Sequence, residues 1–279
     1  MGAFALRRSS PLPGFGISFG ITMALLSIVV LLPLAALLGR GVAIGPAGLW
    51  EALNSNRVWA ALGLSFRSAF IASLFNLVLG LLLAWVLVRY RFWGRKLIDA
   101  AIDLPFALPT AVAGIALTTL YAPNGVFGQV LGQFGIKVAY TELGIWVALI
   151  FIGLPFVVRT VQPVIEEIDR DVEEVSATLG ASRLRTLRRV VLPTLTPALL
   201  TGFALALARS VGEYGSVIFI AGNLPGKTEI APLLIVIRLE EFNYAGAAAI
   251  GIAMLIISFA MLFVINAIQV WSRKRIGYV

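Results

Sequence analysis

Arg209 and Glu213 are the charged pair best placed to act on a ligand, because both fall in an otherwise apolar stretch. Arg209 lies past Pro197 by about 18 Å of helix at 1.5 Å per residue, near the middle of a bilayer. A charge at that depth is costly unless it is paired or faces water, and a spacing of four lets the two side chains meet. Two interpretations stay open: the pair lines a path that favours an anion, with Ser210 and Tyr214 beside it, or it is a structural ion pair that never touches substrate.

The composition excludes most enzyme chemistry. The 279 residues contain no histidine and no cysteine, which removes the commonest general base, the commonest metal ligand and every disulfide. We therefore expect no catalytic, metal or cofactor-binding residues. Asp99 and Asp103 come nearest to a membrane-enzyme site, but carboxylates near a helix start more often interact with the helix dipole and lipid headgroups.

The run AGNLPGKT at 221–228 nearly spells a phosphate-binding loop. A genuine loop of that kind follows a buried strand, whereas here an apolar span precedes it. We therefore expect no nucleotide at this position.

Membrane helices must position these residues. Hydrophobic residues make up 59% of the chain and charged residues 13%, whereas about 25% of residues are charged in soluble domains. A spanning helix needs about 20 apolar residues. Six stretches qualify: 17–38, 64–88, 100–121, 143–163, 197–220 and 246–271. Pro105 and Pro109 break the third stretch. The six stretches together predict an all-α membrane protein with about six transmembrane helices.

The cations predict the orientation, because Lys and Arg collect in cytoplasmic loops. With the N-terminus inside, fifteen of the 22 Lys and Arg residues fall on the cytoplasmic side and six outside. We therefore expect both termini in the cytoplasm, and we attribute the net charge of +8 to headgroups and topology, not to nucleic acid. The predicted parts are residues 1–40, the N-terminus and first helix; 41–63, an external segment with Trp50 and Trp59 as interface anchors; 64–271, the transmembrane domain; and 272–279, a basic cytoplasmic tail.

A polar block, EEIDRDVEEVSATLGASRLRTLRR, runs from Glu166 to Arg189 between the fourth and fifth spans. Its carboxylates come early and its arginines late, which suits a helix macrodipole, and Gly180 between them breaks or caps the helix. Apolar residues recur at spacings of three and four, namely Ile165, Ile168, Val172, Val175 and Leu179. So much charge keeps this amphipathic helix outside the bilayer, with its apolar stripe turned towards another protein.

The spacing of Glu174, Gly180, Val190 and Leu192-Pro193 resembles the E-A-A-x3-G-x9-I-x-L-P signature of ABC-importer permease subunits. Val175 and Ser176 stand in place of the two alanines. The resemblance implies that residues 164–193 form a cytoplasmic coupling segment that docks on an ATPase. The alternative is an ordinary amphipathic loop helix on another kind of membrane protein. The residues implied to contact the ATPase are Glu173, Glu174, Val175, Ser176, Ala177, Leu179, Gly180, Ala181, Leu192 and Pro193.

Two further stretches, Ala208–Asn223 and Glu229–Ala247, are similar to the T-type (or U-type) permease subunits of sulfate/thiosulfate importers. The resemblance implies a type I ABC-importer permease (MetI-like) fold with an extra N-terminal helix, in the bacterial cytoplasmic (inner) membrane. It implies three partners: a homologous W-type permease, an ABC ATPase dimer holding ATP and Mg, and a periplasmic or lipid-anchored sulfate/thiosulfate-binding protein. This chain would bind no cofactor and would move sulfate, and thiosulfate, by alternating access. A molybdate/tungstate permease and an ion-gradient-driven anion transporter are the alternatives.

Two weaker patterns remain. Ala204, Ala208, Gly212 and Ser216 recur every four residues, a spacing of small side chains that lets helix backbones approach closely. We expect a packing seam there, either within the chain or against a second permease subunit. Residues 231–239 are apolar but too short to span; they form either a helix that contacts an external binding protein, with Glu229, Glu240 and Glu241, or a helix packed on the domain.

Overall fold

The computed structural model describes residues 14–276, without the side chains of Arg170 and residues 272–276. Within this range the chain is helical and contains no strand. The first part of the predicted N-terminal region, residues 1–13, and the end of the predicted basic tail, residues 277–279, lie outside the described residues.

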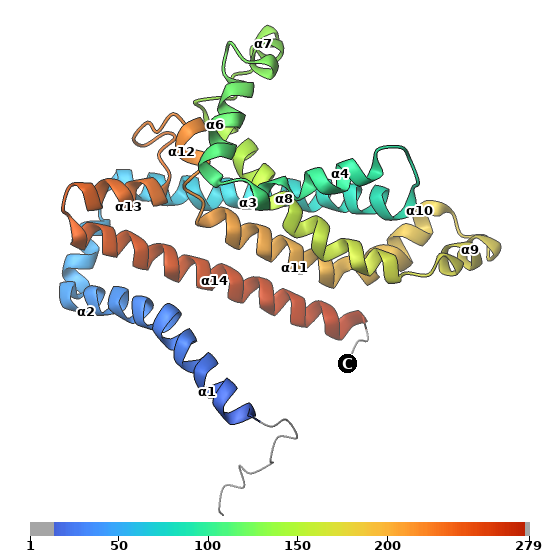
Figure 1. The fold of residues 1–279 in the computed structure, drawn as a ribbon, viewed down its shortest axis with the longest axis horizontal. Coiled ribbons are helices and arrows are strands. Elements are labelled where there is room, and N and C mark those ends of the chain that lie inside the picture. The colour runs from blue at the N-terminus through green and yellow to red at the C-terminus, as the bar shows by residue number, and fades with distance from the viewer. Residues whose placement is uncertain (1–13, 277–279) are drawn as a thin grey trace, which may run out of the picture.

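Five helices of the described chain are long and apolar enough to cross a membrane. The first, Phe15–Leu53, comprises α1 (Phe15–Leu26), a π-helical turn η1 (Ser27–Leu31) and α2 (Leu32–Leu53). The others are α3 (Asn56–Arg89), α8 (Glu142–Glu167), the continuous run of α10 (Arg183–Thr186), π-helical η2 (Leu187–Val191) and α11 (Leu192–Val211), and α14 (Tyr244–Ile276). In Figure 1, α3, α8, α11 and α14 run along the long axis of the molecule. The predicted all-α membrane architecture is confirmed.

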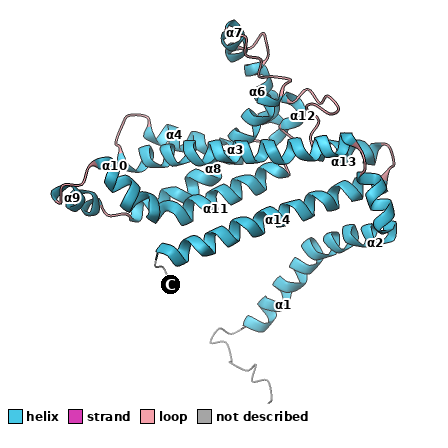
Figure 2. Cartoon of the chain, turned by 180° about the vertical axis from the view of Figure 1, so that it is seen from behind, coloured by secondary structure: helices cyan, strands magenta, loops and turns pink. Residues whose placement is uncertain are grey.

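The third predicted span, 100–121, is not one helix. It is divided among α4 (Arg95–Ile102), α5 (Leu104–Ala107) and α6 (Thr110–Tyr121), and α7 (Val126–Gln133) follows. Pro105 lies in the first turn of α5 and Pro109 precedes α6 in an extended conformation, so each proline begins a new helix in place of kinking one. Both views show α6 and α7 projecting from the bundle (Figure 2).

The predicted external segment 41–63 is helical apart from a turn at Asn54–Ser55, because α2 continues to Leu53 and α3 begins at Asn56. Gly45, with φ +74°, and Pro46 interrupt α2 within it. Trp50 and Trp59 are both more than half exposed, as membrane-interface anchors would be. The apolar side chains of α1 are exposed throughout, so this helix packs on nothing within the described chain.

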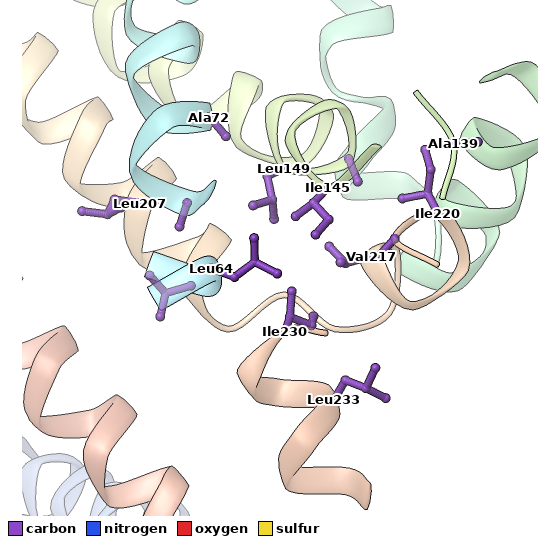
Figure 3. Close-up of a cluster of buried hydrophobic side chains, with 14 of the residues drawn as sticks. Leu64, Ala72, Ala139, Ile145, Leu149, Leu207, Val217, Ile220, Ile230 and Leu233 are labelled. Carbon is purple, nitrogen blue, oxygen red and sulfur yellow. The ribbon is translucent and has the colours of Figure 1, made fainter. Parts of the chain in front are cut away.

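The core lies where α3, α8 and α11 cross. Figure 3 shows Leu64 of α3 and Ile145 and Leu149 of α8 pointing towards one another, and these three side chains are buried in one cluster with Leu207 of α11. Small residues allow close approach: a Cβ on Gly80 of α3 would stand 2.7 Å from Cγ1 of Val157 on α8. These three helices therefore form a tightly packed body from which the charged elements extend.

The fifth predicted span, 197–220, begins and ends earlier than expected. The apolar helix runs from Arg183 to Val211, and Gly212 terminates it. A short helix, α12 (Val217–Ile220), and then α13 (Ala231–Glu240) follow as separate elements. The sequence prediction missed this end because the residues of α12 are as apolar as those of α11.

Candidate functional site

The predicted coupling segment, residues 164–193, lies at the end of the bundle opposite α13 (Figure 1). It contains α9 (Arg170–Thr178), a turn at Gly180, and α10. The predicted amphipathic helix is shorter than expected, because Ile165 belongs to α8 and Ile168 is extended, with ψ 111°. Asp169 then caps α9, its side chain accepting a hydrogen bond from Asp171 N at 3.3 Å. Asp is common at this N-cap position, because its carboxylate accepts a hydrogen bond from a backbone N–H of the first helical turn.

Gly180 turns the chain back after α9. Its φ is +79°, in the left-handed region that only glycine adopts without cost. Gly180 N donates to Ala177 O and Ala181 N donates to Ser176 O, both at 3.0 Å, which is the Schellman pattern of a helix C-terminus. The predicted break at Gly180 is confirmed.

The apolar stripe of this segment is uncovered. Val175, Leu179 and Leu184 are 56%, 82% and 54% exposed. They lie among carboxylates and arginines, in a segment too charged to enter hydrocarbon. An apolar stripe rimmed by charge marks a protein-binding surface.

The structure separates the ten residues implied to contact the ATPase into two groups. Eight lie on α9 and its C-terminal turn, most of them exposed, but Leu192 and Pro193 are half-buried at the start of α11. Glu173 is turned inwards and pairs with Arg89, Oε1 to Nη2 3.0 Å.

Arg89, the last residue of α3, is a functional candidate that sequence reasoning missed. Its Nη2 also donates to Ile168 O at 3.0 Å, and its guanidinium carbon lies 5.4 Å from the centre of the Trp85 ring. The side chain is only 10% exposed. Arg89 therefore joins α3 to both sides of the α8–α9 junction. No local sequence pattern identifies Arg89, because its partners lie about 80 residues away in the chain.

Arg209 and Glu213 form the predicted ion pair, but not on one helix. Because α11 ends at Val211, Glu213 lies in the turn beyond it. One carboxylate oxygen accepts from Arg209 Nη1 at 2.5 Å, and the other accepts from Ser216 N and Ser216 Oγ at 2.9 and 3.0 Å. Glu213 is 3% exposed and Arg209 34%. Ser210 is buried and Tyr214 half-buried, so Arg209 is the member of the predicted pathway set that presents a charge at the surface of this chain.

The four small residues do not form a continuous seam within this chain. Ala208 and Gly212 are exposed, Ala204 is half-buried, and Gly212 ends the helix. Ser216 instead meets α6: a Cβ on Gly114 would stand 2.5 Å from Ser216 O. Contact between the exposed residues and a second permease subunit stays a prediction.

Asp99 and Asp103 share one arginine. Arg159 of α8 donates from Nη1 to Asp99 Oδ1 and from Nη2 to Asp103 Oδ2, each at 2.6 Å. Asp103 is the N-cap residue of α5 and so lies at a helix start as expected, whereas Asp99 is the fifth residue of α4. The shared guanidinium pairs with both carboxylates, offsets one of their two negative charges and ties α4 to α8, which argues against an acid–base pair.

The loop before α13 is anchored by charge. Glu229 is buried and accepts from Arg57 Nε and Nη2 at 2.8 and 2.7 Å. Of the three carboxylates considered for contact with an external binding protein, Glu229 is therefore buried within this chain, whereas Glu240 and Glu241 are exposed. The glycine-containing run 221–228 follows helix α12, not a strand, and Thr228 Oγ1 accepts from Leu224 N at 2.9 Å within it.

Residues 76–278 match the protein family described as binding-protein-dependent transport system inner membrane component. The chain is 51% identical over 268 residues to the sulfate transport system permease protein CysT of Salmonella typhimurium, covering 96% of this chain and 97% of that protein. It is 50% identical to CysT of Escherichia coli over 276 residues, covering 99% and 100%. Among solved structures, a chain of the bacterial alginate ABC transporter in complex with alginate pentasaccharide-bound periplasmic protein has a TM-score of 0.76 at 17% identity, covering 91% of this chain and 93% of that chain. This last likeness concerns the fold alone.

Proposed function

The chain belongs to the family of binding-protein-dependent transport system inner membrane components, and we propose that it is the membrane-spanning permease subunit of an ATP-driven sulfate importer. The exposed apolar stripe at Val175, Leu179 and Leu184 carries the proposal. An ion-gradient transporter acting as a lone chain has no use for an apolar stripe in the aqueous phase.

ATP hydrolysis belongs to a partner. A dimeric ABC ATPase, holding ATP and Mg, receives the coupling segment, and this chain binds no cofactor. Closing the ATPase dimer moves the segment, and the movement passes into α11 because α10, η2 and α11 form one continuous helix. Alternating access then exposes the path first to the outside and then to the cytoplasm.

Sulfate is the substrate named for relatives that share half of this sequence over nearly its whole length. A molybdate or tungstate permease is less well supported, because neither anion is named among these relatives. Thiosulfate has the same tetrahedral shape and charge and is the second expected substrate. Arg209 is the residue that favours an anion, because it is the partly exposed member of the pair and lies in the last turn of α11.

The remaining partners follow from the same family. A homologous W-type permease completes the path, and a periplasmic or lipid-anchored sulfate/thiosulfate-binding protein delivers the anion at the α13 end. Both termini face the cytoplasm of a bacterial inner membrane, on the side of the coupling segment.

Leu179→Asp tests the docking role directly. Leu179 is 82% exposed, so a charge there leaves the fold of this chain intact while disrupting an apolar contact. We expect the ATPase to be lost when the tagged permease pair is purified, and labelled sulfate uptake in proteoliposomes to fall at least tenfold, which corresponds to about 1.4 kcal/mol of lost docking.

Phe242→Asp is the matched control, since Phe242 is 78% exposed but follows α13 at the opposite end. It should copurify with the ATPase as the unmodified protein does. Normal ATPase binding and uptake in Leu179→Asp would contradict the docking role. Uptake by the unmodified chain without any ATPase would contradict the proposed function.

A further inference from the structure

The coupling segment is joined to the membrane helices in three ways. It continues directly into α11, and it joins α8 through the extended residues Ile168 and Asp169. The third connection is the side chain of Arg89, at the end of α3. The extended junction alone would let α9 swing relative to α8, because two non-helical residues carry no helical hydrogen bonds across it.

Arg89 removes that freedom. Its Nη2 binds the carbonyl of Ile168, on the junction, and the carboxylate of Glu173, on α9. Because a carbonyl on one side of the joint accepts a hydrogen bond from the guanidinium and a carboxylate on the other side forms a salt bridge with it, the swing of α9 relative to α8 is restricted. Packing of Arg89 against Trp85 and its 10% exposure fix the guanidinium itself.

The other end of α3 carries a second arginine that also pairs with a carboxylate distant in the sequence. Arg57, the second residue of α3, holds the fully buried Glu229 carboxylate through two hydrogen bonds. Ser65 Oγ, two turns further along α3, accepts from Ala231 N at 2.8 Å. The loop before α13 is thus attached to α3 at two points, while its tip, 224–227, is exposed.

Between the two arginines, α3 is one unbroken helix without proline. Arg89 lies 32 positions beyond Arg57, which corresponds to about 48 Å of helix at 1.5 Å per residue, more than the thickness of a bilayer core. The helix packs along α8, and small residues such as Gly80 bring the two backbones close. Close packing of this kind has low compressibility and transmits strain along the helix.

We propose that α3 is a rigid strut that links the external 221–230 loop to the coupling segment, with Arg57 and Arg89 as positioning residues that clamp its two ends. The inference rests on the proposed function. In this proposal, α3 transmits the docking of the loaded binding protein on the external side to the ATPase on the cytoplasmic side. Neither arginine touches sulfate or ATP in this scheme; each acts through the carboxylate that it holds.

The test uses the complete complex in proteoliposomes, with the ATPase and the sulfate-loaded binding protein. The quantity measured is the ratio of ATP hydrolysis with loaded binding protein to that without. We expect Arg57→Gln and Arg89→Gln each to lower this ratio at least about fivefold, the smaller end of ordinary coupling between sites. Exchanging the charges in Arg89→Glu/Glu173→Arg should restore part of the ratio, which a merely structural role would not predict.

Arg67→Gln is the control, because Arg67 also lies on α3 and pairs with Glu142, but that pair is exposed and ties α3 only to α8. Its ratio should be unchanged. Arg57→Lys keeps the charge that Glu229 needs but loses the two-pronged contact, and it tests the clamp if Arg57→Gln does not assemble. The strut is contradicted, and the proposed function is not, if the stimulation ratio is normal both in Arg89→Gln and in Arg57→Gln (or in Arg57→Lys). An absence of sulfate-dependent stimulation in the unmodified complex overturns the proposed function and the strut with it.

Discussion

Removing the guanidinium of Arg209 should cost more stability than neutralising Glu213, although the two belong to one ion pair. Glu213 is 3% exposed, and Arg209 Nη1 is its charged hydrogen-bond donor. Arg209→Ala leaves a buried carboxylate without a counter-charge, a change that costs about 3–5 kcal/mol in a fully buried pair. Because Arg209 is 34% exposed, water can enter where it stood, and we expect about 2–3 kcal/mol.

Glu213→Gln is the milder change. The amide oxygen still accepts from Ser216 N and Ser216 Oγ, and the partly exposed Arg209 can hydrate. We expect a loss of about 1 kcal/mol, the net value of one hydrogen bond. The double variant Arg209→Ala/Glu213→Gln removes both charges and should recover about 1–2 kcal/mol relative to Arg209→Ala alone.

Two assays on the purified complex separate the interpretations of this pair. The first is the thermal unfolding midpoint, which should rank Glu213→Gln above the double variant and the double variant above Arg209→Ala. The second is labelled sulfate uptake at matched protein amounts. If Arg209 favours the anion, uptake is lost in Arg209→Ala and in the double variant but kept in Glu213→Gln; if the pair is structural, uptake follows the midpoint. A midpoint for Arg209→Ala at or above that of Glu213→Gln would refute the electrostatic reasoning.

Two glycines give further predictions. Gly180→Ala forces a side chain into the left-handed region and should destabilise the turn by about 1–2 kcal/mol, measurable as faster hydrogen exchange at residues 176–181; no atom lies within 4 Å of the added Cβ, so unchanged exchange would refute the conformational argument. Gly114→Ala drives a methyl group into the backbone of Ser216 and should cost about 1–3 kcal/mol, seen as a lower unfolding midpoint. Gly63→Ala, a helical glycine with open space around its Cβ, is the control and should not lower the midpoint.

The long helices could be predicted from the sequence because hydropathy alone identifies them. The predicted spans 64–88, 143–163 and 246–271 fall within α3, α8 and α14. The ends could not be predicted as well, because apolar residues continue past them. Gly212 ends α11 although α12 beyond it is equally apolar, and Pro109 starts α6 in the middle of an apolar stretch. Such ends depend on what the chain packs against, which hydropathy does not record.

The candidate site divides in the same way. Arg209 and Glu213 were predictable because four residues separate them, and the turn at Gly180 because a glycine divides acids from bases. The clamps formed by Arg89 and Arg57 were not, since Glu229 lies 172 residues beyond Arg57. From the sequence, Glu229 looked like one more surface carboxylate. Its burial follows only from the tertiary fold.

The two π-helical turns have a consequence for the Leu-Pro pair of the coupling signature. Leu192 N donates to Leu187 O, five residues back, directly before Pro193, and Leu32 N donates to Ser27 O in the same way before Pro33. Each π-helical turn contains one residue more than an α-helical turn, and it lies directly before a proline, which has no backbone N–H to donate. One residue corresponds to about 100° of rotation about a helix axis. Deletion of the surplus residue at Val191 would therefore rotate α10 by about 100° about the helix axis relative to α11. Pro193 and the π-helical turn before it thus set the rotational position of α10, and of the exposed Leu184 that it carries, relative to α11.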